Sequence, residues 1–245
     1  MMDYEKDGFA IFEANDATRA WARAAHKIAC EVTADPEQQA QWLRHQNTWF
    51  VGVDALPNAE DGSITNVALS GPWQEYVSAP SHWHKAQISV VYEGYPKQDK
   101  EQSDANHRFR INRAAAHVDG LLLENGKRYL REPHAFILGI SLNESDAAPL
   151  KVWPGSHTLM GAELAKALNA GPDLTGVYKA TRARVFETIE PVDVPLRFGQ
   201  SILLHRHMLH GMSPWQAGQT APKEGRMTAY FRPQFDNAKD WLPLS

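Results

Sequence analysis

The order in which helical and β patterns follow one another is the strongest constraint on the fold of this chain. A short apolar run at 8–12 reads as a strand, and two helix-start signals follow, a capping Asn15 or Asp16 and the pair Asp35-Pro36. Further along, β patterns dominate, without a regular alternation of strand and helix. Because parallel sheets need that alternation, the sequence predicts a mainly β fold, a sandwich or jelly roll with flanking N-terminal helices.

The later β segments are bounded by glycine, proline and polar turn residues. A polar stretch at 97–107 predicts an exposed loop, and the stretch 161–170, which stops at Gly171-Pro172, predicts a single interrupting helix. The predicted strands are 87–95, 108–118, 134–143, 194–205 and 225–234.

Size and charge limit the classes of function. The 245 residues show no internal repeat and no low-complexity linker, so we expect one domain over residues 1–245. Hydrophobic residues make up 43% and charged residues 22%, which is typical of a globular core and argues against disorder. The net charge of −4 comes without a block of Lys or Arg, so we expect no nucleic-acid partner.

Cysteine usage and hydropathy bear on the compartment. Cys30 is the only cysteine, so no intrachain disulfide can form. No signal-peptide pattern and no apolar run long enough to span a bilayer is present. We therefore expect a cytoplasmic protein without a membrane partner; the pattern carries no signal of the oligomeric state.

A histidine and a carboxylate two residues apart form the clearest candidate for chemistry. His117 and Asp119 end a predicted strand, where side chains two apart point to the same face, and Val118 between them should point into packing. With a third ligand, for which His210 is the leading candidate, they would form the facial triad that suits non-heme iron(II). An isolated H-x-D pair is a weak signal, because it also occurs as a surface hydrogen-bonding pair.

Other histidines compete for the ligand role or invite a plainer interpretation. If 205–207 stay extended, His205 and His207 share a face and offer an alternative pair. His82 and His84 form an H-x-H without an evident carboxylate partner, so we interpret them as structural or as part of a substrate pocket.

Several short motifs occur together and in a consistent order. In combination the sequence resembles the phytanoyl-CoA dioxygenase family of iron(II)- and 2-oxoglutarate-dependent oxygenases. The stretches that carry the resemblance are DGFAIF at 7–12, HVD at 117–119, WPGSH at 153–157, GQSILLH at 199–205, HG at 210–211 and RMTAYF at 226–231.

The resemblance implies a double-stranded β-helix (jelly roll, cupin-like) with catalytic iron(II) held by His117, Asp119 and His210. His210 is preferred over its neighbours because the following glycine matches the family and the chain must turn there. The resemblance also implies that Arg226 binds the distal carboxylate of 2-oxoglutarate, because a guanidinium clamps a carboxylate through two parallel hydrogen bonds. Thr228, on the same strand face, would assist.

Three features depart from the family pattern. The loop between His210 and Arg226 is longer than usual, which leaves Arg232 as a weaker candidate clamp and Arg206 as a weaker one still. Val118 stands where some relatives carry a polar residue that helps to hold the cosubstrate, and Gln200 stands where Asp is common. None of these departures touches the three candidate ligands.

The implied activity is the oxidation of a small molecule with O2 and 2-oxoglutarate, releasing succinate and CO2. Related halogenases replace the carboxylate with a small residue, so an intact Asp119 predicts hydroxylation or another oxidation rather than halogenation. Two rivals stay open: a cupin-like metal-binding protein without oxidative turnover, and a zinc-dependent hydrolase or isomerase. Neither rival needs an arginine clamp for 2-oxoglutarate.

Overall fold

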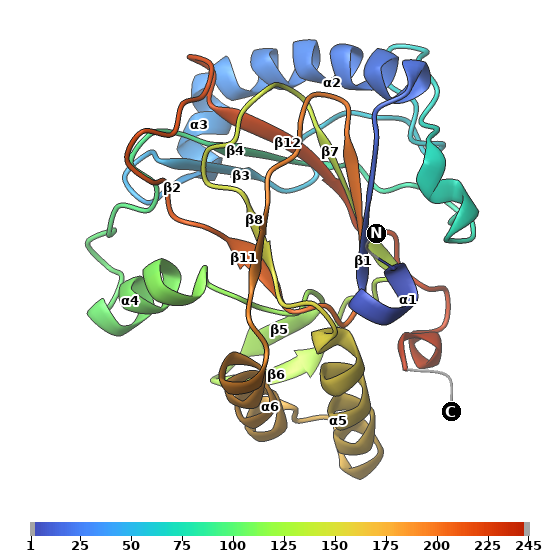
Figure 1. The fold of residues 1–245 in the computed structure, drawn as a ribbon, viewed down its shortest axis with the longest axis vertical. Helices are drawn as coiled ribbons and strands as arrows, with labels where there is room; N and C mark the ends of the chain where they lie inside the picture. The colour runs from blue at the N-terminus through green and yellow to red at the C-terminus, as the bar shows by residue number, and fades with distance from the viewer. Residues whose placement is uncertain (1–2, 243–245) are drawn as a thin grey trace.

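Two antiparallel sheets face each other in the computed structural model, which describes residues 3–242 (Figure 1). The large sheet has seven strands in the order β1-β10-β7-β12-β4-β3-β2, and the small sheet has three in the order β11-β8-β9. The strands of the large sheet are β1 (Phe9–Phe12), β2 (Leu43–Arg44), β3 (Trp49–Gly52), β4 (Gln87–Val91), β7 (Phe136–Ser141), β10 (Ser201–His205) and β12 (Arg226–Phe231). The remaining strands are β8 (Leu150–Val152), β9 (Val192–Val194) and β11 (His210–Met212), with a separate hairpin of β5 (Leu121–Glu124) and β6 (Lys127–Leu130).

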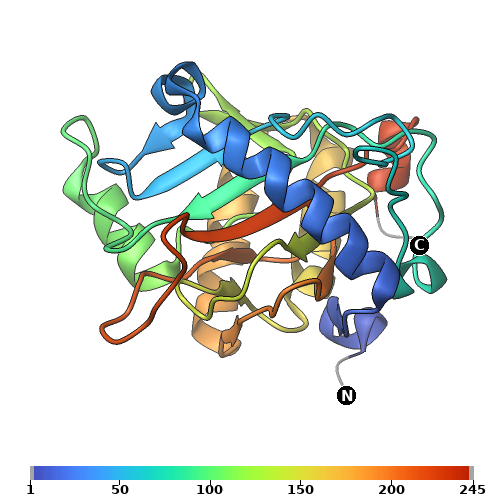
Figure 2. The same cartoon turned by 90° about the horizontal axis from the view of Figure 1, so that it is seen from above.

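Helices flank the two sheets, and one of them covers a face of the large sheet (Figure 1). The long helix α2 (Asp16–Ala34) crosses the outer face of the large sheet (Figure 2). It begins with a capping box, in which the Asn15 side chain accepts from Thr18 N at 2.9 Å and Thr18 Oγ1 accepts from Asn15 N at 3.0 Å. The other helices are α1 (Tyr4–Asp7), α3 (Pro36–Trp42), α4 (Asp104–Arg113), α5 (Ser156–Ala170) and α6 (Thr175–Thr188), with 3-10 turns η1 (Pro72–Glu75) and η2 (Ala238–Trp241).

Strand alternation divides the large sheet into a helix-covered face and an inner face. On β12, Met227, Ala229 and Phe231 join the core beneath α2, together with Trp21 of that helix. Ile137 of β7 points the other way, into a core shared with both sheets. The even-numbered positions of β12 therefore face the interior between the sheets, where a jelly roll places its functional groups.

The predicted fold class is confirmed: the protein is mainly β, with flanking helices and two facing antiparallel sheets arranged as a jelly roll. The expected strands near 8–12, 134–143 and 225–234 and both N-terminal helices are present. The predicted strand at 194–205 is divided, because β9 pairs with β8 in the small sheet whereas β10 pairs in the large one. Among the described residues, no helix is both long and apolar enough to cross a membrane.

The predicted strand at 108–118 is wrong. Residues 104–113 form α4, which also replaces part of the exposed loop expected at 97–107. The Ser103 side chain caps this helix by accepting from Asn106 N, and Asp104 in the first turn and Arg113 in the last complement the helix dipole. Arg108 and Arg110 alternate with apolar residues, as they would in a strand with one charged face. The capping residues nevertheless favour a helix here.

The region between β8 and β9 is more helical than predicted. The helix expected at 161–170 begins earlier, at Ser156, and a second helix, α6, follows it. Tyr178 and Val185 of α6 are fully buried against α5. The two helices bury apolar residues against each other. The spacing of these residues along α6 is too irregular for the helix to have been predicted from the sequence.

Candidate metal centre

Three polar side chains from two separate segments meet at one end of the interior. His117 and His210 lie opposite each other on an isolated antiparallel bridge, in which each backbone N–H donates to the carbonyl of the other residue, at 2.8 and 3.1 Å. Asp119 follows two residues after His117 on the same side, while Val118 between them is buried in the core against α5 and α6. The local alternation expected around Val118 is therefore present although the long preceding strand is not.

The side chains of His117, Asp119 and His210 are close enough to share one ion. Their ligand atoms all lie within 4.8 Å of one another. His117 Nε2 lies 3.0 Å from Asp119 Oδ1, and His210 Nε2 lies 3.8 Å from Asp119 Oδ2. The His117 side chain is 46% exposed whereas that of His210 is 7% exposed, so the group is open on one side only.

Both imidazoles are oriented in the same way by the backbone. Nδ1 of His117 lies 3.0 Å from the carbonyl oxygen of Ala115, and Nδ1 of His210 lies 3.0 Å from that of Met208. A carbonyl oxygen can only accept, so Nδ1 carries the proton in each ring and Nε2 keeps its lone pair. This second hydrogen bond is the arrangement that orients metal-binding histidines.

Charge at the centre is balanced by Arg232. Its Nε donates to Asp119 Oδ2 at 2.6 Å, and its Nη1 donates to Gln87 Oε1 at 2.7 Å. Burial raises the pKa of Asp119, but the charges of Arg232 and His210 outweigh it and hold that pKa well below its usual range. Burial lowers the pKa of His210 to about 4, so both groups are in the protonation state that a metal ion requires.

This donor set fits a divalent transition metal. Two neutral imidazoles and one carboxylate supply a mixed nitrogen and oxygen face, and such a face leaves further coordination positions free. The orientation of the rings supports this fit, because the unprotonated Nε2 atoms of His117 and His210 both point at the carboxylate of Asp119. A closed structural zinc site would have four protein ligands, and among the described residues no fourth candidate belongs to the group.

The three residues line a cavity of about 540 Å³ between the sheets. Side chains of β3, β4 and β12 line it, together with residues of the segment from α4 to β5. This volume is in the range typical of small-molecule sites. Among the other residues that line it are Trp49, Val53, Gln87, Tyr95, Arg110, Leu122, Met212, Tyr230 and Arg232.

The predicted clamp residues Arg226 and Thr228 lie on the inner face of β12, and both are buried. Arg226 Nη1 donates to Thr228 Oγ1 at 3.1 Å, Nη2 lies 3.2 Å from Met212 Sδ, and Nε has no partner among the described residues. Arg226 does not itself line the cavity, but Met212 does. The flexible Met212 side chain therefore lies between the Arg226 guanidinium and the cavity beside the candidate metal ligands.

The structure separates the competing histidines from this centre. His205 and His207 form a second group with His157. The ring centroids of His157 and His205 are 4.9 Å apart and those of His205 and His207 are 5.2 Å apart, and neither His205 nor His207 belongs to the candidate metal centre. His82 and His84 are exposed and pack against each other. The chain turns before His210 rather than after it, because His210 and Gly211 belong to β11.

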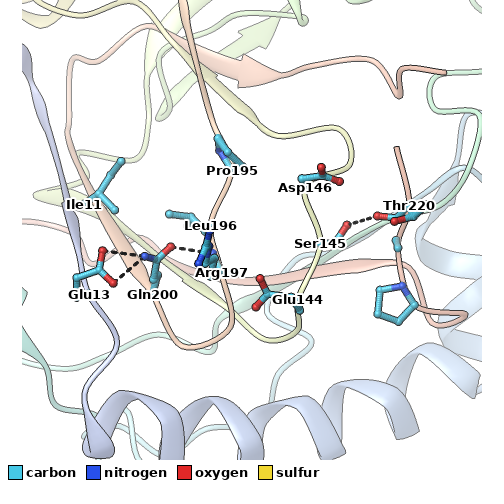
Figure 3. A pocket seen from close by; sticks show the side chains of 12 residues that line it. Ile11, Glu13, Glu144, Ser145, Asp146, Pro195, Leu196, Arg197, Gln200 and Thr220 are labelled. Atoms are coloured by element: carbon cyan, nitrogen blue, oxygen red, sulfur yellow. Dashed lines mark hydrogen bonds between the residues drawn. The ribbon is translucent and has the colours of Figure 1, made fainter. Parts of the chain in front are cut away.

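A second cavity, of about 960 Å³, lies elsewhere, and its lining contains none of the three candidate ligands (Figure 3). Gln200 spans it, donating to both Glu13 carboxylate oxygens at 3.0 Å and accepting from Arg197 N at 2.8 Å. Gln200 thus braces β1 against the turn before β10, and its polar neighbours satisfy one another. We assign no chemistry to this cleft.

Sequence reasoning missed two side chains of the centre. Gln87 supports Arg232, and Arg232 pairs with the candidate metal carboxylate, although it was considered only as a weaker clamp for 2-oxoglutarate. Alternation along β12 and the residue after it could have placed Arg232 in the interior, because Arg226, Thr228, Tyr230 and Arg232 are two apart and share a face. The same rule places Gln87 inside on β4.

Among the comparisons with known proteins, only that with solved structures bears on the fold. No protein-family model and no curated protein matches the chain. Among solved structures, the non-heme alpha ketoglutarate dependent carbocyclase SnoK from nogalamycin biosynthesis matches with a TM-score of 0.56 and 16% identity, over 95% of this chain and 85% of that one. At 16% identity this likeness shows the jelly-roll fold and not the activity.

Two further solved structures match with TM-scores below 0.5, so we draw no conclusion about the fold from them. The epimerase SnoN in complex with Fe3+, alpha ketoglutarate and nogalamycin RO has a TM-score of 0.49 and 16% identity, over 94% of this chain and 80% of that one. EctD from S. alaskensis with bound Fe has a TM-score of 0.47 and 16% identity, over 93% and 73%.

Proposed function

We propose that this protein is an iron(II)- and 2-oxoglutarate-dependent oxygenase of small molecules, with His117, Asp119 and His210 as the iron ligands. The observation that carries the proposal is the meeting of two imidazole Nε2 atoms and one buried carboxylate on the wall of an open cavity. A triad of this kind leaves adjacent positions free for cosubstrate and O2. SnoK, which shares the fold, is described as a non-heme alpha ketoglutarate dependent enzyme, and this supports the same assignment.

Arg226 is our candidate for the residue that binds the distal carboxylate of 2-oxoglutarate, with Thr228 beside it. Its Nε is buried and has no hydrogen-bond partner among residues 3–242, which is unfavourable unless an anion completes its hydrogen bonds. Met212 must move aside for the cosubstrate to reach it, and methionine, being unbranched and flexible, can adopt another rotamer readily.

The remaining residues orient and shield the reacting groups. Iron(II), held by His117, Asp119 and His210, would supply the activation of O2, with two electrons coming from oxidative decarboxylation of 2-oxoglutarate and two from the substrate. One oxygen atom enters succinate, CO2 leaves, and the second oxygen enters the substrate when the outcome is hydroxylation. Arg232 keeps Asp119 ionised and oriented, and the cavity walls exclude water.

Finer assignments belong to the same proposal. We infer membership of the phytanoyl-CoA dioxygenase family from WPGSH at 153–157 and the surrounding motifs, and a single domain over 1–245. An intact Asp119 argues against halogenation, so hydroxylation is the first product class to test. SnoK is named a carbocyclase, so other oxidations are the second. The cytoplasmic location and the absence of a nucleic-acid partner stay predictions.

The first test measures cosubstrate binding and succinate formation together. Protein loaded with iron(II) under nitrogen receives 2-oxoglutarate and then O2, and succinate is quantified; in parallel, 2-oxoglutarate is titrated calorimetrically into manganese(II)-loaded protein. We expect Asp119→Ala to lose metal binding, and Arg226→Ala to keep the metal but lose 2-oxoglutarate affinity by about tenfold or more, as expected for a charge-assisted pair. Asp146→Ala and Arg197→Ala, both at exposed residues of the other cleft, are the matched controls.

Succinate that disappears in both site variants and persists in both controls supports the oxygenase. Absence of succinate together with absence of 2-oxoglutarate binding overturns it in favour of a metal-binding jelly roll without oxidative turnover. Tight metal binding with a preference for zinc and no response to 2-oxoglutarate favours the hydrolase or isomerase instead.

A further inference from the structure

Helix α4 brings one arginine into the cavity of the candidate metal centre. Arg110 lines that cavity, and Arg108, two residues earlier on the same helix, is exposed and does not. Side chains two apart on a helix point to opposite sides, so the helix, in place of the expected strand, separates the two residues. Arg110 is therefore the residue of α4 that meets the contents of the cavity.

The Arg110 guanidinium is held in place but not neutralised. Nη1 donates to the Tyr95 hydroxyl at 2.9 Å, and the guanidinium carbon lies 5.6 Å from the centroid of the Trp49 ring. Its Nε is buried and has no hydrogen-bond partner in the part of the chain that the structure describes. Within residues 3–242, no carboxylate forms an ion pair with it. A fixed cation with unused donors in a partly enclosed space favours an anionic ligand.

The other arginines at this cavity already have partners or a proposed role. Arg232 is paired with Asp119, and Arg128 donates to the Leu121 carbonyl and covers the Tyr178 ring. Arg226, which lies behind Met212 and does not line the cavity itself, is the proposed clamp for the distal carboxylate of 2-oxoglutarate, whose other carboxylate would lie at the metal. Arg110 is left without a carboxylate after the cosubstrate is accounted for.

Apolar side chains surround the approach to the same space. Val53 and Leu122 line the cavity and are 48% and 43% exposed, and Trp49 forms part of the inner wall. Large apolar residues left open at a cavity mouth are a sign of an apolar ligand surface. The site thus pairs one fixed cation with an apolar rim.

We propose that the substrate of this enzyme is a small organic acid with an apolar body, whose carboxylate pairs with Arg110 while its carbon skeleton rests between Trp49 and the rim of Val53 and Leu122. This inference rests on the proposed function, because it uses the cavity beside the candidate iron ligands. It identifies Arg110 as a binding residue for the substrate and not for the cosubstrate. Tyr95 is the positioning residue that directs the guanidinium.

Binding near the metal can be measured without turnover. The probes are 3-phenylpropionate, indole-3-acetate and octanoate, each compared with its uncharged primary amide. Protein saturated with 2-oxoglutarate is loaded either with manganese(II) or with zinc(II), and broadening of the probe proton resonances by manganese reports binding close to the metal. The variants are Arg110→Gln, Arg110→Lys and the matched control Arg108→Gln, each checked for folding by circular dichroism.

We expect at least one acid to bind the wild-type protein about tenfold or more tightly than its amide, the scale of one charge-assisted hydrogen bond. Arg110→Gln should lose that preference, Arg110→Lys should keep part of it, and Arg108→Gln should keep all of it. Affinity for 2-oxoglutarate should be unchanged in Arg110→Gln.

Three results would overturn the inference. Acids that bind no better than amides, or do not bind, exclude the substrate class, and a preference that persists in Arg110→Gln excludes the residue. Loss of 2-oxoglutarate binding in Arg110→Gln, with normal binding in Arg226→Ala, would make Arg110 the cosubstrate clamp. Because succinate formation is measured separately, the oxygenase assignment can survive the first two results.

Discussion

Gly211 lies where the two segments of the candidate metal centre come closest. A Cβ atom added there would be 2.1 Å from the Ala114 carbonyl oxygen and 3.0 Å from its carbon. Glycine after His210 is thus required by a close backbone approach rather than by a turn. The approach also allows Met212 N to donate to Ala114 O at 3.0 Å, which aligns β11 with the segment that carries His117.

Gly211→Ala should therefore separate these segments and lower the free energy of unfolding by about 1–3 kcal/mol, the usual penalty of overpacking. The matched control is Gly176→Ala in α6, where no atom lies within 4 Å of the added Cβ. That variant should be neutral or more stable by up to about 1 kcal/mol, because alanine favours helix. Urea denaturation of the metal-free variants measures both; equal stabilities of the two variants would contradict the close-approach account.

For Arg232 the sequence indicated the functional region correctly but did not indicate Asp119 as its partner. Its charge and its position near the end of the last strand made it a candidate clamp for 2-oxoglutarate. In the structure it pairs with Asp119 and is held by Gln87, so it acts on the candidate ligand set directly. A charged pair of this kind is decided by which side chains converge in space, and Gln87 is distant in sequence.

At the scale of elements, α2 holds the large sheet from outside and its start is set locally. The Asn15 side chain and Thr18 hydroxyl satisfy backbone N–H groups that a helix start leaves free. Trp21 is fully buried beneath the helix, and its Nε1 donates to the Gly62 carbonyl at 2.9 Å.

Asn15→Ala should lower the free energy of unfolding by about 1 kcal/mol, since alanine cannot accept the hydrogen bond from Thr18 N. Glu31→Ala, at an exposed position within the same helix, should change it by no more than about 0.5 kcal/mol. Thermal and urea denaturation of both variants provide the measurement. A loss in Glu31→Ala as large as that in Asn15→Ala would point to general helix destabilisation instead of the cap.

Helix α4 is the element whose prediction changed most, and the change has a functional consequence. As a strand, residues 108–118 would have placed Arg108 and Arg110 on one face. As a helix, they point apart, and only Arg110 reaches the cavity. The proposed recognition of an acidic substrate therefore depends on a conformation that the alternating pattern did not reveal.

At the scale of the whole molecule, a group of buried histidines should make folding sensitive to acid. His157, His205 and His207 pack together away from the candidate metal centre, and His207 is 1% exposed with neither ring nitrogen hydrogen-bonded among the described residues. Burial lowers the pKa of His205 to about 3 and that of His207 to about 2. The folded state therefore keeps these rings neutral where the unfolded chain would protonate them.

Stability from a histidine with a lowered pKa is present above the unfolded pKa of about 6.5 and is lost as the pH falls towards the folded value. For His207 alone, the free energy of unfolding should fall by about 1.4 kcal/mol between about pH 7.5 and about pH 5.5. His207→Phe should reduce the drop by that amount, whereas His82→Phe, at an exposed residue, should leave it unchanged. Urea titrations at both pH values test this, and an unchanged drop in His207→Phe would exclude the assignment.

How much could be predicted depends on the range of the interactions. The fold class, both N-terminal helices and the strands at 134–143 and 225–234 followed from capping residues and two-residue alternation, which neighbours in sequence set. The convergence of His117, Asp119 and His210 was expected from the motifs, and the structure brings the three together; their role as iron ligands stays a prediction.

The sequence by itself determined which residue types face inward on each strand, because alternation along an extended chain is a local property. Only the tertiary structure decided which inward residues meet. It paired Arg232 with Asp119, put Met212 between Arg226 and the cavity, and turned Arg110 towards Tyr95. Such contacts join residues distant along the chain, so they depend on how the sheets and helices pack, and no local pattern contains that information.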